Sequence, residues 1–513
     1  MPRLTAVLVL AALIAAPLAL RVTPPPAPAG ARTLVVVTPH GEHIRHEFGR
    51  AFADWAREHR GVQVVFDWRT PGGTSDIKRF LIDRYQAHFA LKHRELADVA
   101  TAILDPRASQ SEDPRERQAR EVFLASEVGV GVDLFFGGGV FPYQEFADRG
   151  MLVDAGLIQA EPDWFTETVI PQSLSGETIY DPQGRFYGAC LGVFGITASP
   201  PRLRQLGIAD LPTQWSDLGE PAYLGQLTLT DPTKSGAAVA AFERILQQQM
   251  AEHPDDLDRG WREGLTLIKR LFGNARSITD SSSKPARDVV RGDCAASMAL
   301  DFQAKFEAEI AREVGGEDRL VFATPLGGTG ASADPIGLLR GAPNRDLAVD
   351  FIRFVLSPAG QRLWNYRLGT PGGPERYCLR RLPVRKDVLD AEWKQYAADP
   401  DEDPFAVGAA FTYRGEWTGR YYRLIGPLIK AIAMDCRDEV VAAWSAIVVA
   451  GGPEAVPEAY AAFSEIPFPY AEADAAQQAA LAKSPGNLAT LRAWTDGAIA
   501  AYARAERLAR EGR

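Results

Sequence analysis

Residues 34–55 read LVVVTPHGEHIRHEFGRAFADW, and this stretch decides the fold class. The apolar run 34–37 predicts a short buried strand, and the turn residues 38–41 end it. A helical pattern follows, with one apolar face made of Ile44, Phe48, Ala51, Phe52 and Trp55. The stretch therefore predicts a strand, a turn and a helix in that order.

The same unit recurs further along the chain. Residues 62–68 predict a second strand, and residues 70–75 a second turn before a helix. Two more strands, 132–136 and 226–230, each end in a glycine-rich or polar turn. Such alternation predicts an α/β fold with mainly parallel sheets.

Length and composition bound the class of protein. The chain has 513 residues, 46% of them apolar, which is more than one hydrophobic core usually organises, so we expect at least two domains. The formal net charge is −10 and the sequence has no block of Lys and Arg. Because nucleic-acid binders neutralise phosphates with clustered cations, we expect no nucleic-acid partner.

The N-terminus carries the pattern of an export signal. Arg3 is followed by the uncharged run 4–20, and then by Arg21 and a proline-rich segment whose small residues offer cleavage points. Residues 1–31 therefore predict a signal peptide. The apolar run is also at the lower limit of length for a membrane-spanning helix, so an uncleaved anchor is the alternative. Both interpretations predict a periplasmic or extracellular protein.

Four cysteines are too few and too widely spaced for a disulfide scaffold or a zinc motif. Cys190 and Cys294 lie in apolar stretches and are expected to be buried thiols, whereas Cys378 and Cys436 are candidates to pair. Residues 401–513 are rich in alanine and aromatic residues with helical spacing, which predicts a helical C-terminal extension.

Several turns that follow strands are candidate binding elements. Ligands of open α/β sheets bind at the carboxyl ends of the strands, and the free N–H groups of a following helix suit anionic groups. Three turns qualify, 40–41, 72–75 and 233–236, although each alone also fits an ordinary helix cap. Thr74 or Ser75 is the expected N-cap after the second turn. Together the three turns predict a pocket for an anion.

Histidine spacing gives one further candidate. His40, His43 and His46 recur at intervals of three, close enough on a helix for metal coordination in principle. His43 and His46 fit a solvated helix face better, so only His40 is kept as a site residue. Asp301 ends the apolar run 295–300 and is either a ligand contact, a helix cap or an ion-pair partner.

The usual catalytic motifs are missing from the sequence. Glycines 137–139 follow a strand, but the G-x-G-x-x-G pattern is not completed. The sequence also contains no P-loop, no H-E-x-x-H and no G-x-S-x-G. We therefore predict a protein that is not an enzyme and that has no catalytic residues, resident metal or cofactor.

Taken in order, the turns resemble a known family. The matching stretches are LVVVTPHGE (34–42), GGTSD (72–76), VDLFFGGG (132–139), Tyr187-Gly188, TDPTKSG (230–236), RGDCAASMALDF (291–302), and GAPN (341–344) with the helix that ends at SPAGQ (357–361). The ordered set spans about residues 33–390. It resembles the type II periplasmic solute-binding proteins of bacterial ABC importers, in particular the ferric-iron and organophosphate branch.

The resemblance implies two α/β lobes, joined by crossing strands, that close on a ligand about a hinge. Lobe I is expected over 33–195 and 328–400, and lobe II over 196–327, with residues 401–513 as the helical extension. The resemblance also implies that the closed form is presented to the permease subunits of a membrane transporter. We expect a monomer.

One departure from the family bears on the ligand. Iron-binding members carry adjacent tyrosines where this chain has Phe302 and Gln303, and neither residue can supply a phenolate for ferric iron. We therefore predict a small anionic solute, an organophosphate, phosphonate or carboxylate. The predicted ligand-binding residues are His40, Gly41, Arg69, Gly73, Thr74, Ser75, Gly138, Thr233, Ser235, Gly236 and Asp301.

Three alternatives stay open. A ferric-iron carrier would use His40, Asp301 and other groups, so that iron is the transported ligand. An exported hydrolase or transferase would use the same two residues as acid and base. A sensor module would signal to a partner protein through residues 401–513.

Overall fold

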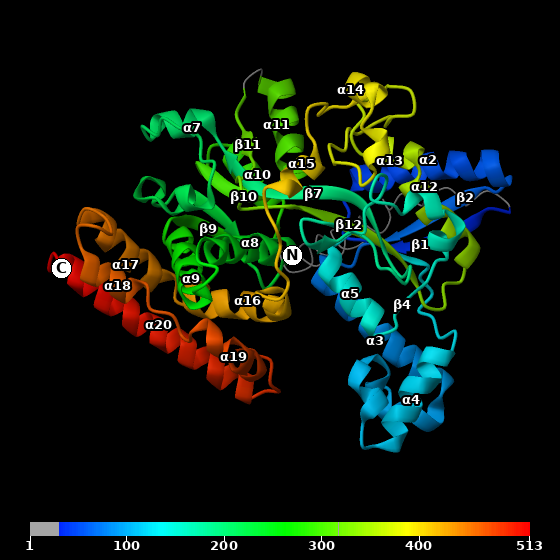
Figure 1. Cartoon of the computed structure of the whole chain (residues 1–513), viewed down its shortest axis with the longest axis horizontal. Helices are drawn as coiled ribbons and strands as arrows, with labels where there is room; N and C mark the ends of the chain where they lie inside the picture. Colours follow the sequence, from blue (N-terminus) through cyan, green and yellow to red (C-terminus); the bar gives the residue numbers. More distant parts are fainter. Residues whose placement is uncertain (1–29, 316–317) are drawn as a thin grey trace, which may run out of the picture.

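The computed structural model describes residues 30–315 and 318–513, which form two lobes side by side (Figure 1). Residues 1–29, which carry nearly all of the predicted signal peptide or anchor, lie outside the described residues. In the described part of the chain, no helix is both long enough and apolar enough to cross a membrane.

The first two predicted units form as expected. Their elements are β1 (Arg32–Val37), α2 (Glu42–Arg60), β2 (Val64–Arg69) and α3 (Thr74–Lys92). The predicted face of α2 is buried at Ile44, Phe48 and Phe52. The predicted N-cap of α3 is wrong, because the helix already begins at Thr74 and Gly73 is the cap. The Asp76 side chain accepts the Gly73 N–H at 3.2 Å and holds this start.

The sheet is mixed rather than mainly parallel, and two long strands cause the difference. These strands, β7 (Tyr187–Ala198) and β12 (Ala331–Leu339), run antiparallel to each other between the lobes. The strand order is β2-β1-β3-β12-β7-β10-β8-β9, where β3 is Leu134–Phe136, β8 Leu227–Thr230, β9 Ala275–Thr279 and β10 Ala296–Leu300. Pairing is parallel within β2-β1-β3 and β10-β8-β9 and antiparallel where these groups meet the crossing strands.

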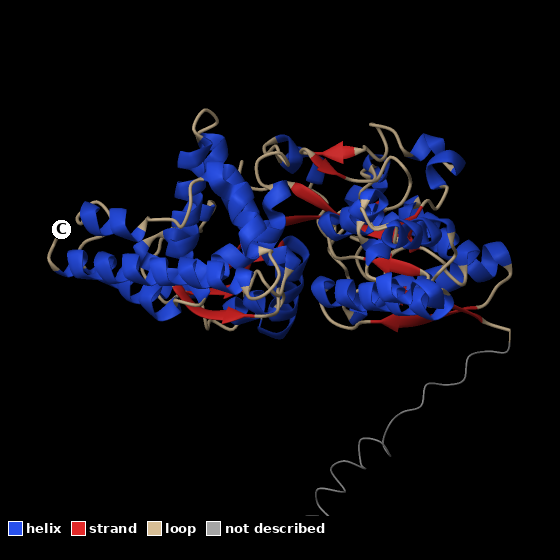
Figure 2. Cartoon of the chain, turned by 90° about the horizontal axis from the view of Figure 1, so that it is seen from below, coloured by secondary structure: helices blue, strands red, loops and turns tan. Residues whose placement is uncertain are grey.

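Helices pack against the strands in each lobe (Figure 2). In lobe I they are α4 (Pro114–Ala125), α5 (Val140–Asp148), α6 (Leu157–Ala160), α12 (Arg345–Leu356), α13 (Pro358–Leu363) and α14 (Ala391–Tyr396). In lobe II they are α7 (Pro200–Gln205), α8 (Gly236–Glu252), α9 (Leu257–Gly273), α10 (Lys284–Val290) and α11 (Asp301–Gly315). Short strands β4 (Leu152–Val153) and β11 (Val321–Ala323) pair with β12 and β7, and β5 (Ser173–Leu174) pairs with β6 (Glu177–Thr178).

The C-terminal segment is helical, as predicted, and from residue 417 on it packs into lobe II, whereas Phe405 of α15 packs against the lobe I core (Figure 1). Its helices are α15 (Pro404–Ala409), α16 (Tyr422–Ile429), α17 (Arg437–Val449), α18 (Pro457–Phe463), α19 (Ala473–Ala480) and α20 (Gly486–Arg510). One hydrophobic cluster joins the buried residues between 194 and 298 to those between 417 and 509. The segment is thus a layer of the lobe II core, where the sequence predicted an extension.

All four cysteines are buried free thiols. Cys190 lies on β7 and Cys294 just before β10, in agreement with the expectation for these two. Cys436 belongs to the lobe II cluster, whereas the Cys378 thiol lies against the Tyr366 carbonyl of lobe I. The considered pairing of Cys378 with Cys436 is not formed, because the two residues lie in different lobes.

Candidate functional site

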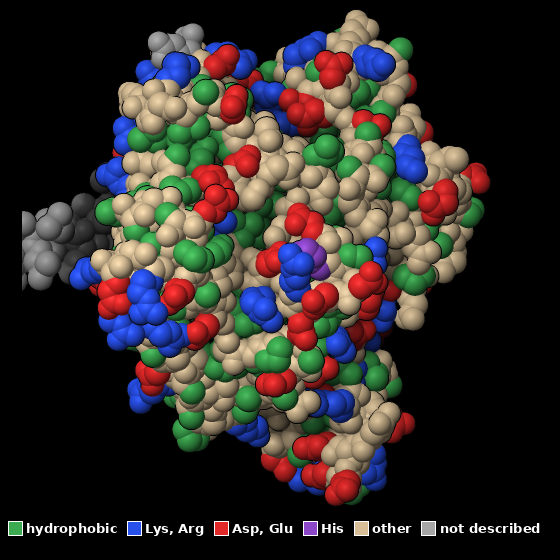
Figure 3. All heavy atoms as spheres, turned by 60° about the vertical axis from the view of Figure 1, so that its left-hand side comes forward, with side chains coloured by type: hydrophobic (Ala, Val, Ile, Leu, Met, Phe, Trp, Pro, Cys, Tyr) green, Lys and Arg blue, Asp and Glu red, His purple; other side chains and the backbone are tan. Residues whose placement is uncertain are grey.

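A cavity of about 780 Å³ lies between the lobes and is lined by both. Its floor includes residues of the crossing strands, namely Gly192, Phe194, Ser332 and Asp334. On the face that Figure 3 shows, acidic and basic side chains are intermixed without a broad field of one sign. This cavity, called the cleft below, is the candidate binding site.

Three helices begin at the wall of the cleft. The lining includes Gly73 and Thr74 at the start of α3, Gly139 and Val140 at the start of α5, and Ser235 and Gly236 at the start of α8. Ser235 caps α8, because its Oγ accepts the Ala238 N–H at 3.3 Å. The first N–H groups of a helix have no partner within the helix, and the helix dipole makes them favourable to negative charge. Both lobes therefore contribute helix starts to the cleft, and these helix starts favour the binding of an anion.

Six of the predicted ligand-binding residues line the cleft, namely His40, Gly73, Thr74, Gly138, Ser235 and Gly236. The other five, Gly41, Arg69, Ser75, Thr233 and Asp301, are not among the lining residues. Local contacts account for two of these: Arg69 pairs with Asp67 at 3.0 Å, and the Thr233 hydroxyl donates to Asp231 at 2.7 Å. Gly41 and Ser75 are exposed at the starts of their helices.

Asp334 on β12 lies at one end of the cleft and was not predicted from the sequence. Its Oδ2 accepts from His40 Nε2 at 3.0 Å and from Arg381 Nη1 at 2.5 Å, and its Oδ1 accepts the Gly138 N–H at 2.5 Å. Residues 137–139 all have positive φ, which favours glycine at each position. The N–H groups of Gly138 and Gly139 donate to the Asp334 carboxylate, whereas the Gly137 N–H donates to the Pro335 carbonyl at 2.7 Å.

The charge states of this group follow from its contacts. Burial opposes ionisation of Asp334, but Arg381 and His40 outweigh it and hold the pKa of the carboxyl well below its usual range. Burial lowers the pKa of His40, and Asp334 only partly opposes this. A neutral His40 that donates from Nε2 leaves Nδ1 as an acceptor, and among the described residues this atom has no partner.

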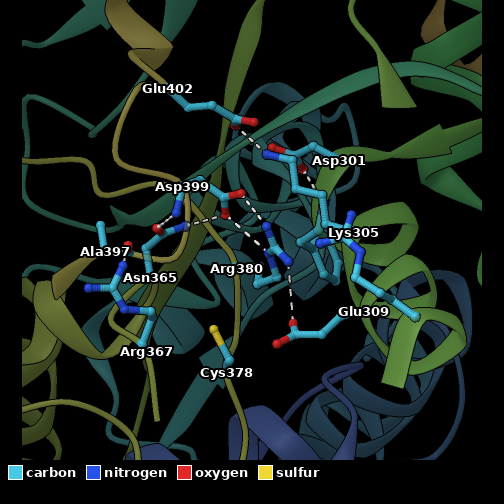
Figure 4. Close-up of polar contacts among 12 residues, drawn as sticks. Asp301, Lys305, Glu309, Asn365, Arg367, Cys378, Arg380, Ala397, Asp399 and Glu402 are labelled. Carbon is cyan, nitrogen blue, oxygen red and sulfur yellow. Dashed lines mark hydrogen bonds and ion pairs between the residues drawn. The ribbon is translucent and has the colours of Figure 1, made fainter. Parts of the chain in front are cut away.

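Asp301, the first residue of α11, is buried (Figure 4), and its neighbours Leu300 and Phe302 line the cleft. Its Oδ1 accepts the N–H of the next residue, Phe302, at 2.8 Å. Burial raises the pKa of Asp301 to about 6, against the opposing effect of Lys305 and Arg381. Of the two residues considered as acid and base, His40 lines the cleft and pairs with Asp334, whereas Asp301 is not among the lining residues.

Further lining residues were not predicted, and most of them lie far from the recognised turns. Arg244 on α8 is buried, forms an ion pair with Glu177 of lobe I, and lies 3.8 Å from a carboxylate oxygen of Glu243. Tyr413 and Tyr422 come from the C-terminal segment. No local pattern marks these positions, because they reach the cleft through the packing of one lobe on the other.

Comparison with known proteins identifies the family. Residues 132–405, more than half of the chain, match the model described as bacterial extracellular solute-binding protein. The chain belongs to this family. The family expected from the sequence is thereby confirmed, and the crossing strands of this solute-binding protein fall within the matched residues.

Two curated relatives match shorter parts of the solute-binding protein. An uncharacterized protein from Haemophilus influenzae is 28% identical over 233 residues, which are 45% of this chain and 60% of that protein. The phosphoglycerate transport regulatory protein PgtC from Salmonella typhimurium is 27% identical over 152 residues, 30% of this chain and 34% of that protein. The chain thus matches less than two thirds of the length of either relative.

Solved structures with a similar arrangement are distant in sequence. The periplasmic binding protein AfuA from Actinobacillus pleuropneumoniae, with exogenous fructose-6-phosphate bound, is 19% identical, with a TM-score of 0.47 over 78% of this chain and 98% of its own. Apo ferric ion-binding protein A from Pasteurella haemolytica is 13% identical, with a TM-score of 0.48 over 80% of this chain and 98% of its own.

Proposed function

We propose that the protein is the solute-binding component of an ABC importer and that it captures a small anionic solute in the cleft. The solute is an organophosphate, a phosphonate or a carboxylate, and the closed protein delivers it to a membrane permease from the periplasm. The observation that carries this proposal is the convergence of three helix starts, from α3, α5 and α8, on one cavity between two lobes.

The charged side chains of the cleft favour recognition through N–H and hydroxyl groups. Arg381 is held by Asp334, and Arg244 by Glu177, so neither guanidinium is free of a carboxylate. The exposed ammonium of Lys234 lies beside the start of α8. An anion would therefore be bound by helix N–H groups, by hydroxyls such as those of Thr74 and Ser235, and by Lys234.

Sequence similarity to the Salmonella phosphoglycerate transport regulatory protein supports the same class of solute. Phosphoglycerate carries a phosphate and a carboxylate, and both are groups that helix N–H donors accommodate. The shared region is about a third of that protein, so it supports the chemical class and not a particular compound.

The donor set does not favour ferric iron. A hard ferric ion binds ionised oxygen ligands, and burial raises the pKa of Tyr413 and of Tyr422 well above the usual range, so that both phenols are harder to ionise than an ordinary tyrosine. Within residues 30–315 and 318–513, no group of three His, Cys, Asp or Glu side chains is placed to hold a metal ion. An organic anion is the solute that this lining suits better.

The test is to measure which solutes bind the purified protein. Native mass spectrometry identifies what co-purifies, and thermal-shift assays compare 3-phosphoglycerate, methylphosphonate, citrate, ferric chloride, putrescine and glucose. We expect stabilisation by one or more of the organic anions. Stabilisation by putrescine, glucose or iron alone would contradict the proposal.

A matched pair of variants tests the site itself. Ser235→Ala and Ser357→Ala each remove a helix cap, since Ser357 Oγ accepts the Gly360 N–H at 3.2 Å at the start of α13. Both are expected to lower stability by about 1 kcal/mol. Only Ser235→Ala is expected to weaken binding of the anion, by about tenfold, or about 1.4 kcal/mol, in isothermal titration calorimetry. Equal affinities in the two variants would place the anion elsewhere.

A further inference from the structure

The cleft has one wall that lies outside the family match. Residues 408–422, called the strap below, lead from α15 into α16 and contribute Tyr413, Gly415, Gly419 and Tyr422 to the lining. The match to the family ends at residue 405. The strap therefore adds side chains to the cleft that the matched region does not supply.

The strap is fixed on lobe II by hydrogen bonds to α8. Glu243 accepts from the Tyr413 hydroxyl at 2.8 Å and from the Thr418 hydroxyl at 2.7 Å. The side chain of Gln247 accepts the Arg414 N–H at 2.9 Å and donates to the Arg414 carbonyl at 2.8 Å. Because Glu243 and Gln247 are both buried, these bonds define the path of the strap along the helix.

The same segment also contacts lobe I. The Tyr413 N–H donates to the Ser175 carbonyl at 2.6 Å, and Ser175 Oγ donates to the Gly408 carbonyl at 2.8 Å. Gly176 has φ +82°, and a Cβ at this position would lie 2.1 Å from the Tyr413 carbonyl oxygen. The close approach of the strap to lobe I thus requires glycine at 176.

The end of the strap places an aromatic ring beside two helix starts. Tyr422 stacks on Phe141 of lobe I, with ring centroids 4.2 Å apart and an interplanar angle of 26°. Its hydroxyl donates to the carbonyl of Gly236, the first residue of α8, at 2.8 Å. Phe141 is in the first turn of α5. An anion held by these helix starts would have the Tyr422 and Phe141 rings next to it.

We propose that the strap selects solutes that carry an organic body beyond the anionic group, with the rings of Tyr413 and Tyr422 packed against that body. This inference rests on the proposed function. The cleft volume of about 780 Å³ is in the range typical for organic ligands, and far more than an inorganic anion fills. A solute without carbon atoms would leave the rings in contact with water, so their apolar area would contribute nothing to its affinity.

Calorimetry with 3-phosphoglycerate and inorganic phosphate tests the strap. We expect the wild type to prefer 3-phosphoglycerate by at least about tenfold, and Tyr422→Ala to reduce this preference to about threefold or less. Tyr422→Phe keeps the ring and should keep the preference. Tyr502→Phe is the matched control, since Tyr502 also donates to a carbonyl, that of Ile432 at 2.6 Å, in the lobe II core.

A second pair of variants moves the strap without changing a tyrosine. Gly176→Ala and Gly207→Ala both place a side chain at positive φ, but only the first meets the strap, since nothing lies within 4 Å of a Cβ at Gly207. We expect Gly176→Ala to lose the preference for 3-phosphoglycerate over inorganic phosphate and Gly207→Ala to keep this preference. An unchanged preference in Tyr422→Ala and Gly176→Ala would overturn the role of the strap and leave the proposed function intact. A wild type that binds neither 3-phosphoglycerate nor any other organic anion tested would overturn both.

Discussion

Asp334 holds two cationic or polar groups, Arg381 and His40, at one end of the cleft. It is the partner of Arg381, a fully buried guanidinium, and of His40. We expect Asp334→Ala to lower the free energy of unfolding by about 3–5 kcal/mol, because Arg381 would stay buried without its carboxylate. Urea denaturation followed by circular dichroism measures this change.

The control is an Asp–Arg pair at the surface. Asp346 pairs with Arg32 at 2.6 Å, but its side chain is 71% exposed. Asp346→Ala is expected to change the free energy of unfolding by less than about 1 kcal/mol. Similar small losses in both variants would show that Asp334 does not hold Arg381 as described.

Among the residues that line the cleft, the sequence predicted those in turns that follow strands. It did not predict those that contact the opposite lobe. Thr74, Gly138 and Ser235 were found because a turn after a strand has a local signal that does not depend on the rest of the fold. Asp334 lies within a strand, and Arg244 within a helix, where neighbouring residues in the sequence say nothing about the opposite lobe. Such positions depend on tertiary contacts between distant parts of the chain.

Among the elements, α9 is tied to the C-terminal helices by Lys269. Its Nζ donates to the carbonyls of Phe463 and Glu465, both at 2.6 Å, where α18 ends. Burial lowers the pKa of this amine to about 7, from an ordinary value of 10.5. Between these two pH values the unfolded chain binds more protons than the folded one, so the free energy of unfolding gains a contribution that rises with pH.

This linkage predicts a pH-dependent difference between two proteins. Relative to Lys269→Met, the wild type is expected to be more stable at pH 9 than at pH 6, by at most about 1.4 kcal/mol for each pH unit in the window. Urea denaturation at both pH values provides the measurement. Lys92→Met, at an exposed position at the end of α3, should have the same free energy of unfolding as the wild type at pH 6 and at pH 9. Parallel pH profiles for the wild type and Lys269→Met would contradict the prediction.

At the scale of the whole molecule, the lobes also meet along α11 (Figure 4). Glu309 of α11 pairs with Arg380 of lobe I at 3.3 Å, and Lys305 of α11 pairs with Glu402, which lies between the end of lobe I and α15. Arg380 has φ +54°, a left-handed conformation that is rare for arginine, and it also pairs with Asp399 of its own lobe. Its neighbour Arg381 lines the cleft and pairs with Asp334. The two adjacent arginines therefore contact different parts of the interface between the lobes.

These ion pairs are expected to favour the closed arrangement of the lobes. The double variant Glu309→Gln with Glu402→Gln should open the ligand-free protein and increase its radius of gyration in small-angle X-ray scattering. Glu313→Gln, exposed on the same helix, is the control and should leave the scattering unchanged. Identical scattering from the double variant and the wild type would contradict a role of α11 in closure.

The sequence predicted the two-lobed α/β fold, but it did not predict that the C-terminal helices pack in the core of lobe II. Alternating strands and helices have periodicities that can be recognised one segment at a time. The C-terminal helices have such a periodicity too, and residues 401–513 were correctly expected to be helical. Their place in the lobe II core was not predictable, because an amphipathic helix does not specify which apolar surface it covers.

The layout of lobe II has a consequence for synthesis. Its core combines buried residues between 194 and 298 with others between 417 and 509, and α20 supplies Tyr502, Ala505 and Leu508. During translation the ribosome makes the second part of lobe I, residues 328–400, between these two sets. The core of lobe II can be completed only after α20 has left the exit tunnel, long after residues 194–298 have been made. A nascent chain that stops before residue 486 exposes this half-built core to water.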